Sequence, residues 1–254
     1  MTIAERAAEF LRLHRATEIL TLVNCWDVIS AKTVAQVPGT KAIATASHAI
    51  SASYGYPDGE AISADEMLTA VGRIAAAVDL PVTADLEAGY GDPAETVRRA
   101  IGLGVVGANL EDQLKPVAEG VAMVTAALKA AESEGVGFVL NARTDAFLRA
   151  PDRPADQSLA DAIERGKAYQ QAGAQCIFVP GVLSLDLIGE LVAALGQQQV
   201  SIMNLPGGPT NQQLQDLGVA RVSIGPAGQL ISLAGYADLA RQLYDGGALP
   251  TPPG

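Results

Sequence analysis

The stretch "VTADLEAGYGDPAETVRRAIGLGVVGANLED", residues 82–112, contains one strand–helix–strand unit. A β-like run at 82–87 is followed by a helical pattern at 93–104 and by a second β-like run at 107–112. Pro93 suits the first turn of the helix between them. Two strands joined through a helix pair in parallel by a right-handed crossover, so the stretch predicts a parallel sheet covered by helices.

The same alternation recurs along the chain. Strand-like runs occupy eight ranges, namely 19–24, 42–47, 82–87, 107–112, 138–143, 176–181, 200–205 and 221–226. Eight strand–helix units are the number that closes a (β/α)₈ TIM-type barrel. A doubly wound open sheet is the alternative, but no GxGxxG or GxxxxGK[ST] phosphate loop follows any of these strands.

We therefore predict one α/β domain over residues 1–254, a (β/α)₈ barrel with a parallel sheet. An amphipathic pattern at 1–16 predicts an N-terminal helix, and "GGALPTPPG" (246–254) predicts a short flexible C-terminal tail.

Composition narrows the class of protein. A hydrophobic share of 49 % with only 4 % aromatic residues predicts an aliphatic core. The net charge of −11 argues against nucleic acid or an anionic membrane as a partner. Cys25 and Cys176 stand far apart without CxxC spacing, which indicates no disulfide and no zinc site and favours the cytoplasm. No apolar run approaches the ~18 residues of a membrane span.

Polar residues gather where three consecutive predicted strands end. In a (β/α)₈ barrel these carboxyl ends form one mouth, where catalytic residues lie. Each pair is spaced i, i+2, so both members are expected on the same face of their strand. The pairs are Asp85 and Glu87, Asn109 and Glu111, and Asn141 and Arg143.

Three acids in one mouth require a positive partner, because buried carboxylates repel one another. Oxygen ligands without Cys or His suit a hard divalent ion, Mg²⁺ or Mn²⁺. The planar fork of Arg143 matches a carboxylate or a developing enolate. A metal with an arginine suits a chelated 2-oxo acid. The alternative is that these acids cap helices or form a network of ion pairs.

Four ordered segments resemble the isocitrate lyase/phosphoenolpyruvate mutase superfamily. They are "ISASYGYPDG" (50–59), "DLEAGYGD" (85–92), "GANLED" (107–112) and "NARTDAF" (141–147). The resemblance runs from about Leu22 to Ser223. It implies a (β/α)₈ barrel, Mg²⁺, and cleavage or formation of a C–C or C–P bond beside an enolpyruvate-like intermediate. It also implies a homo-oligomer, a dimer or tetramer, in which the last helix packs on a neighbouring subunit.

The resemblance also implies roles for individual residues. Asp85 is similar to the direct metal ligand, and Glu87 and Glu111 to acids that hold metal-bound waters. Asp58 resembles a further water-mediated contact, and Arg143 the arginine that stabilises the enolate.

The expected substrate contacts come from the same mouth. Backbone N–H groups of the family contact the substrate carboxylate at the position of Ala46, Ser47 and His48, a sequence that departs from the usual one. Asn109 and Asn141 are expected beside the substrate. Arg143, Glu111 and Asp58 are thus the expected catalytic residues, and Asp85, Glu87 and Glu111 the metal ligands.

Departures from the family's pattern bear on the reaction. The segment "EDQLKPVAEG" (111–120) lacks the cysteine of the isocitrate and methylisocitrate lyases, and Gln113 replaces a lysine of the phosphonomutases. Pro180 and Gly181 stand where a mutase histidine or a lyase glutamate would follow strand six.

The leading hypothesis is a Mg²⁺-dependent lyase that cleaves a C–C bond of a small 2-oxo or 2-hydroxy dicarboxylate. Its reaction would be oxaloacetate decarboxylation or, second, cleavage of a substituted malate. The alternatives are a C–P mutase or hydrolase of phosphonopyruvate or phosphoenolpyruvate, and a non-catalytic barrel that binds a keto acid. In each case the expected partner is a small-molecule carboxylate.

Overall fold

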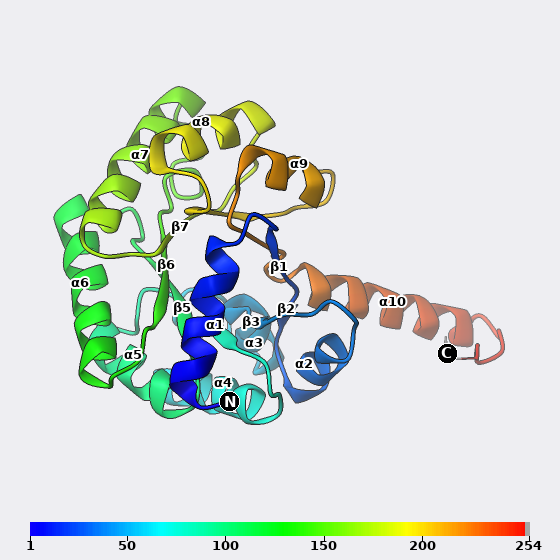
Figure 1. Ribbon diagram of the computed structural model, residues 1–254. Coiled ribbons are helices and arrows are strands. Elements are labelled where there is room, and N and C mark those ends of the chain that lie inside the picture. The colour runs from blue at the N-terminus through cyan, green and yellow to red at the C-terminus, as the bar shows by residue number, and fades with distance from the viewer. Residues whose placement is uncertain (252–254) are drawn as a thin grey trace.

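The computed structural model describes residues 1–251 and shows a parallel β-barrel surrounded by helices (Figure 1). Nine parallel strands follow the order β1-β9-β8-β7-β6-β5-β4-β3-β2. They are β1 (Leu20–Leu22), β2 (Asn24–Cys25), β3 (Ile43–Thr45), β4 (Val82–Asp85), β5 (Gly107–Glu111), β6 (Val139–Arg143), β7 (Cys176–Val179), β8 (Val200–Met203) and β9 (Arg221–Ser223).

The first and last strands in this order close the barrel. β1 and β2 are separated only by Val23, so they are two parts of one extended segment. The first part pairs with β9 and the second with β3. The nine strands therefore form eight staves, and the predicted (β/α)₈ TIM-type barrel is confirmed. Each of the eight predicted strand regions contains an observed stave, although most staves are shorter than predicted.

The helices are α1 (Ile3–Arg15), α2 (Val28–Ala35), α3 (Ser47–Ser53), α4 (Ala64–Ala76), α5 (Pro93–Gly102), α6 (Val117–Ser133), α7 (Ala155–Gln171), α8 (Leu185–Leu195), α9 (Asn211–Leu217) and α10 (Ala227–Tyr244). Local sequence explains several of their starts. Thr2 and Ser63 form capping boxes before α1 and α4, and Pro93 follows the capping Asp92 at the start of α5.

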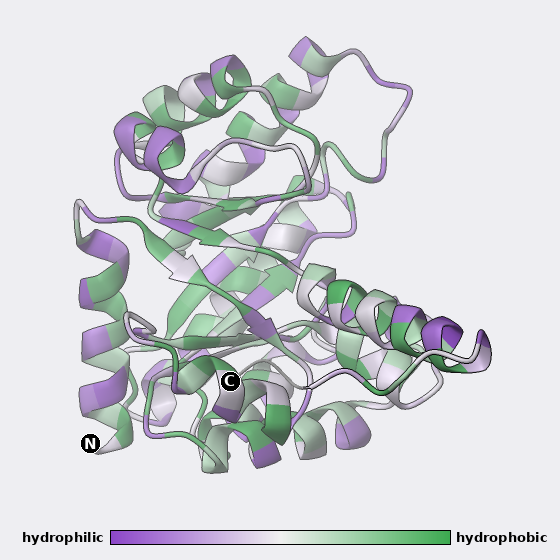
Figure 2. Ribbon diagram, turned by 90° about the vertical axis from the view of Figure 1, so that its right-hand side faces the viewer, coloured by the Kyte–Doolittle hydropathy of each residue, from purple (hydrophilic) through white to green (hydrophobic). Residues whose placement is uncertain are grey.

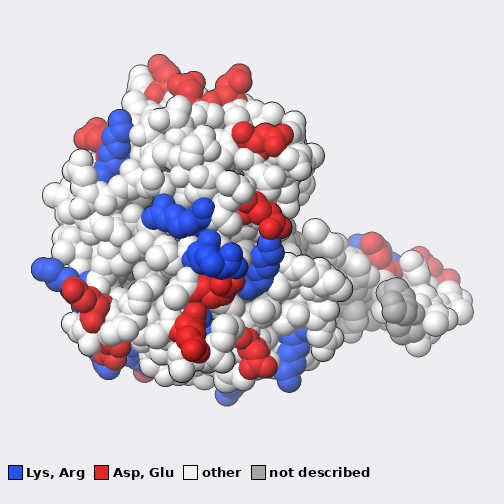
Figure 3. Space-filling view, viewed as in Figure 1, with Lys and Arg blue, Asp and Glu red and all other residues white. Residues whose placement is uncertain are grey.

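Helix α1 covers the amino-terminal end of the barrel, the end that faces the viewer in Figure 1. Phe10 of α1 is fully buried against the first residue of β5, Gly107. A Cβ at Gly107 would lie 2.7 Å from the Phe10 ring, so only glycine allows this contact. On this end of the molecule basic side chains lie beside acidic ones near the centre, and acidic side chains lie along the upper edge of the view (Figure 3). The carboxyl ends of the strands lie at the opposite end.

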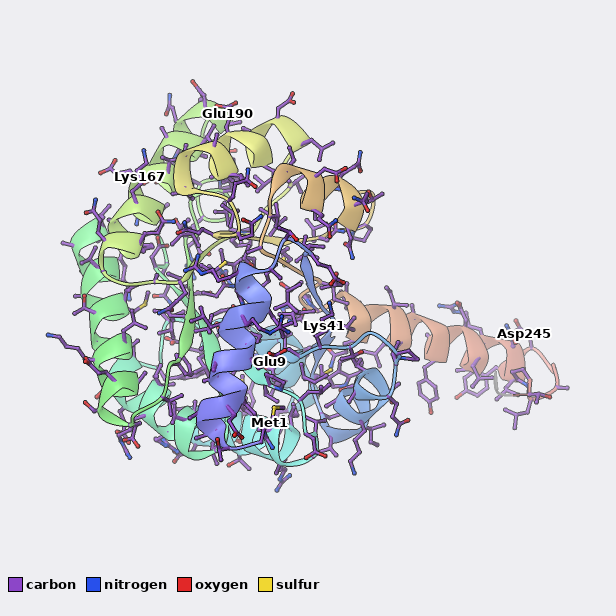
Figure 4. All side chains as sticks on the ribbon, viewed as in Figure 1. Met1, Glu9, Lys41, Lys167, Glu190 and Asp245 are labelled. Atoms are coloured by element: carbon purple, nitrogen blue, oxygen red, sulfur yellow. The ribbon has the colours of Figure 1, made fainter. Side chains whose placement is uncertain are left out.

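Helix α10 extends away from the barrel (Figure 1), and Asp245 marks its far end in Figure 4. Gln229 alone is buried among its described residues, and Leu230, Ile231 and Tyr236 are largely exposed. In Figure 2 the green of hydrophobic residues appears on the interior strands and also on parts of this projecting helix.

The chain after α10 corresponds to the predicted tail. Residues 246–251 have no helix or strand, whereas 252–254 lie outside the described residues, and the flexibility of the tail stays a prediction. None of the helices within residues 1–251 has both the length and the apolar character needed to span a bilayer.

Candidate active site

Asp85, the last residue of β4, is held by hydrogen bonds with residues of three neighbouring elements, α3, β5 and β3. Its Oδ2 accepts hydrogen bonds from Ser47 N at 3.1 Å and Ser47 Oγ at 2.8 Å. Its Oδ1 accepts from Asn109 Nδ2 at 3.5 Å. The backbone N–H of Asp85 donates to Thr45 Oγ1. The carboxylate is thereby fixed at the mouth.

The segment predicted to bind a substrate carboxylate lies beside Asp85. Ala46 is the buried N-cap residue of α3, and Ser47 is the first residue of the helix. The Ser47 N–H is directed at Asp85 in this structure. His48 lies at the surface, with Nδ1 at 3.4 Å from Asp58 Oδ2, and both side chains are about half exposed. Asp58 therefore reaches the rim of the mouth rather than its floor.

Glu87 lies beyond the end of β4 and has a left-handed backbone with φ of 54°. The predicted alternation of Asp85 and Glu87 along one strand is therefore wrong, because the strand ends before Glu87. The Glu87 side chain is nevertheless buried, and Oε1 has no hydrogen-bond partner within residues 1–251. Burial, with repulsion from Asp85, Asp58 and Glu111, raises the pKa of Glu87 to about 8.

Glu111 and Arg143 are direct neighbours in the register of β5 and β6. Arg143 Nη1 lies 2.8 Å from Glu111 Oε2, and Arg143 Nε donates to Asp145 Oδ1 at 2.7 Å. Arg149 completes the group, with Nη2 3.4 Å from Glu111 Oε1 and Nε 3.0 Å from Asp145 Oδ2. We call Glu111, Arg143, Asp145 and Arg149 the charge square, because each carboxylate contacts both guanidinium groups.

Electrostatics within the charge square act in opposite directions on its members. Burial raises the pKa of Glu111 to about 7, although Arg143 lowers it. Burial works against the positive charge of Arg143, but Glu111, Asp145 and Asp85 outweigh it and raise the Arg143 pKa. Arg143 therefore stays charged, with two buried carboxylates bonded to its guanidinium group.

A buried amide chain lies beneath the carboxylates. Asn141 Nδ2 donates to Asn109 Oδ1 at 2.8 Å and reaches Ser201 Oγ at 3.4 Å. Arg221 Nη2 also donates to Asn109 Oδ1, at 3.1 Å. The predicted neighbours Asn109 and Asn141 are thus brought together, and Asn109 connects a buried arginine to Asp85.

Arg221 is an unusual member of this layer. It is 1 % exposed, and its Nε and Nη1 have no partner within the described part of the chain. Burial lowers its pKa to about 10.

The carboxylates of the charged mouth bear on the binding of a divalent cation. No three His, Cys, Asp or Glu side chains in residues 1–251 converge closely enough to hold an ion as they stand. The donor chemistry nevertheless fits one. Glu87 has an unsatisfied buried oxygen. Burial raises the pKa values of Glu87 and Glu111, and repulsion from Asp85 adds to it in both, so a cation would stabilise their charged forms. Asp85, Glu87 and Glu111 therefore fit a hard divalent ion by chemistry.

The loops after β7 and β8 line a neutral pocket of about 410 Å³. No charged side chain lines it. Its lining residues are Gly181, Val182, Leu183, Ser184, Leu185, Ile188, Ile202, Met203, Asn204, Leu205, Pro206, Gly207, Gly208, Pro209 and Gln213. We call this region the neutral half of the mouth, and the ends of β4, β5 and β6 the charged half.

Sequence reasoning missed Asp145, Arg149 and Arg221. Asp145 could have been found, because it continues the i, i+2 series of Asn141 and Arg143 past the strand end. Arg221 opens a strand whose alternation directs it inward, which is also a readable signal. Arg149 lies on an irregular segment, and no periodicity reveals its position.

Known proteins resemble this chain over most of its length. The family model described as phosphoenolpyruvate phosphomutase matches residues 10–244. An uncharacterised protein of Mycobacterium tuberculosis is 32 % identical, with 95 % of this chain and 91 % of that protein covered. An oxaloacetate decarboxylase of Ectopseudomonas mendocina is 28 % identical over 95 % of this chain and 88 % of the relative.

Solved structures include a candidate phosphonomutase from Burkholderia cenocepacia, with a TM-score of 0.88 and 39 % identity, covering 95 % of this chain and 99 % of the other. An oxaloacetate acetylhydrolase in complex with its product oxalate has a TM-score of 0.87 and 26 % identity, with 98 % and 90 % covered.

Proposed function

The chain belongs to the phosphoenolpyruvate phosphomutase family, and from that premise we propose that it is a divalent-metal-dependent carbon–carbon lyase. Its substrate class is a small 2-oxo or 2-hydroxy dicarboxylate, cleaved through a pyruvate-type enolate. The observation that carries this proposal is the placement of Arg143 between buried Glu111 and Asp145, close enough to Asp85 for the two charges to interact.

Asp85, Glu87 and Glu111 are the residues that would hold Mg²⁺ or Mn²⁺. The ion would withdraw electrons from the C2 carbonyl of a 2-oxo acid. Asp85 is the best placed for direct ligation, because Ser47 and Asn109 already fix its orientation. Glu87 contributes an unsatisfied oxygen, and Asp58 lies at the rim for a water-mediated contact.

Arg143 supplies a permanent positive charge to the reacting end of the substrate. Its fork is fixed by Glu111 and Asp145, so no reorganisation is needed when negative charge develops. Asn109 and Asn141 form the floor beneath it. These residues support binding of the 2-oxo carboxylate and stabilisation of the enolate.

Oxaloacetate decarboxylation is the specific reaction that we propose first. The C3–C4 bond breaks, its electron pair passes to the enolate, CO₂ leaves, and a proton then added at C3 gives pyruvate. Bond cleavage needs no general base, because no proton is removed when CO₂ leaves. A relative of similar length is an oxaloacetate decarboxylase. Cleavage of a substituted malate is the second candidate.

A C–P mutase or hydrolase is the alternative, because the chain is 39 % identical to a candidate phosphonomutase of known structure. Lys115 is the one lysine in the segment after β5, and it is exposed, while Gln113 stands where phosphonomutases have a lysine. These two observations favour the lyase.

A substrate panel tests the proposal. The protein is incubated with Mg²⁺ and, separately, with oxaloacetate, phosphonopyruvate and substituted malates, and pyruvate release is followed with a coupled assay. We expect pyruvate from oxaloacetate above the metal-only background, and its loss with EDTA. Turnover of phosphonopyruvate instead would establish the alternative. Binding without turnover of any compound would indicate a non-catalytic keto-acid-binding barrel.

We also infer that the protein is a cytoplasmic homo-oligomer, a dimer or tetramer. Helix α10 is 18 residues long and leaves Leu230, Ile231 and Tyr236 in water, a surface that a second copy would cover. Light scattering on the wild type and on Ile231→Glu tests this, and a monomer in both would contradict it.

A further inference from the structure

Arg149 lies at the edge of the charged half, on the irregular segment that follows β6. Its side chain is 48 % exposed, whereas that of Arg143 is 19 % exposed and that of Asp145 is fully buried. The two arginines therefore differ in position although they share the same pair of carboxylates. Arg143 is the more buried of the two, and Arg149 is the more exposed.

Arg149 is held firmly without using all of its donors. Its Nε bonds to Asp145 Oδ2 at 3.0 Å and its Nη2 to Glu111 Oε1 at 3.4 Å. Within residues 1–251 no acceptor is found for its Nη1. A guanidinium has five N–H donors in a rigid fork, so one edge stays available for an anion. The charge square fixes its direction.

The rest of the mouth offers no comparable cation. The pocket of the neutral half has no charged lining residue, so an anionic group there would lose water without gaining an ion pair. Lys115 lines a second crevice together with Glu111. Among the described residues, its side chain forms no ion pair or hydrogen bond that would fix its position. Arg153, four residues after Arg149, is paired with Asp161 instead.

We propose that Arg149 is the specificity-determining residue that binds the distal carboxylate of the substrate, the one not held at Arg143. This proposal rests on the proposed function, because it takes a dicarboxylate as the substrate class. A 2-oxo acid with one end at Arg143 places its far end toward the opening, where Arg149 is the fixed cation. Monocarboxylates lack this contact and bind more weakly.

Two probes separate the two ends of the site. Oxalate is short and occupies only the Arg143 end, whereas 3,3-difluorooxaloacetate adds a distal carboxylate. Both are titrated by calorimetry into the Mg²⁺-loaded wild type, Arg149→Met and Arg149→Lys. Arg153→Met is the matched control, because it removes an arginine from the same segment outside the mouth. Lys115→Met tests the rival cation.

We expect Arg149→Met to weaken the binding of 3,3-difluorooxaloacetate by about 10- to 100-fold, which corresponds to the loss of a charge-assisted hydrogen bond. Oxalate affinity should change by less than about two-fold, and this also reports that the variant is folded. Arg149→Lys keeps the charge but loses the planar fork, so its affinity for 3,3-difluorooxaloacetate should lie between those of the wild type and Arg149→Met. Arg153→Met and Lys115→Met should match the wild type.

Equal losses of affinity for oxalate and for 3,3-difluorooxaloacetate in Arg149→Met would overturn the proposal. They would indicate that Arg149 only holds Glu111 and Asp145 in place. The same selective loss in Lys115→Met alone would also overturn it, as would a wild type that binds neither probe. The carboxylate assignment would be overturned if phosphonopyruvate bound more tightly than 3,3-difluorooxaloacetate and if Arg149→Met reduced the affinity for phosphonopyruvate more.

Failure of the proposed function is distinguishable from failure of this inference. Suppose that the wild type binds both probes, that Arg149→Met weakens only 3,3-difluorooxaloacetate binding, and that no pyruvate is released. This result contradicts the lyase and supports the Arg149 assignment. If oxaloacetate is turned over, the carboxylate held by Arg149 is the one that leaves as CO₂. Its contact then belongs to binding, so Arg149→Met should raise KM and leave kcat within about two-fold.

Discussion

The charged half of the mouth and the neutral half are built on neighbouring strands of the same barrel, yet their chemistry is opposite. The ends of β4, β5 and β6 bring Asp85, Glu111 and Arg143 together with buried partners. The loops after β7 and β8 enclose about 410 Å³ without a charged side chain. The charged half is ordered by ion pairs and hydrogen bonds, whereas the neutral half has hydrogen bonds, such as that from Asn204 Nδ2 to Pro209 O, and no charged lining residue.

This difference separates two tasks of a lyase. The charged half can hold the part of the substrate that becomes the enolate, because that part develops negative charge. The neutral half can recognise an uncharged substituent only by size, which discriminates weakly. Substitutions in the two halves should therefore have unequal effects, and three measurements test that comparison.

The largest effect is expected from the charged half. Asp85→Asn removes the ionised ligand that is fixed by Ser47 and Asn109 while keeping its shape. Activity should fall by about 100- to 1000-fold, as it does when a fixed electrostatic group is lost from an active site. Steady-state rates check this, with circular dichroism confirming the fold. Arg98→Met on the surface of α5 should retain full activity. Wild-type rates in Asp85→Asn would end the assignment of this carboxylate.

An intermediate effect should appear in stability as a function of pH. The folded pKa values of Glu87 and Glu111, about 8 and about 7, lie above the ordinary 4.5. The folded state therefore binds more protons than the unfolded state between these limits, and metal-free stability falls as pH rises from about 5 to about 8. The loss is about 1.4 kcal/mol per pKa unit, reduced by coupling between the groups.

Thermal melts at several pH values, without and with Mg²⁺, check this prediction. Added Mg²⁺ should restore most of the lost Tm at pH 8 and little at pH 5, because protonated carboxyls bind cations poorly. Glu87→Gln should flatten the metal-free profile. A Tm that rises with pH in the metal-free protein would contradict the raised pKa values.

The smallest effect on the ion and the enolate site should come from the neutral half. Leu205→Ala enlarges the pocket without removing a charge. Affinities for Mg²⁺ and oxalate should change by less than about two-fold, while KM values should shift with the size of the substrate's substituent by up to about ten-fold. A ten-fold loss of Mg²⁺ affinity in this variant would show that the two halves are not separate.

The fold was readable from the sequence because its signal repeats. Each strand–helix unit has the same pattern of a short apolar run and an amphipathic helix, so errors at individual ends, as at 82–87, did not alter the number of staves. The break of the first stave at Val23 was not predicted, because residues 19–25 contain no glycine or proline that would mark a change of hydrogen-bonded neighbour.

The site was readable where it lies on regular strands. Asn109, Glu111, Asn141 and Arg143 follow from alternation, and the structure brings them together as predicted. Glu87 was harder, since a left-handed residue after the strand ends does not obey alternation. Arg149 lies on an irregular segment, where it bonds to Asp145, four residues before it, and to Glu111 of a neighbouring strand. The contact with Glu111 is tertiary and leaves no local pattern.

The stave interrupted at Val23 has a consequence for how the chain folds. It pairs with β9, about 200 residues away in sequence, and each partner is held over only a few residues. Long-range pairs form late because closing a long loop costs entropy. Strand–helix units in the middle of the chain can assemble early, whereas the pairing of β1 with β9 requires both ends of the chain and forms later. Opening should begin there too, so hydrogen exchange is expected to be fastest along β1 and β9.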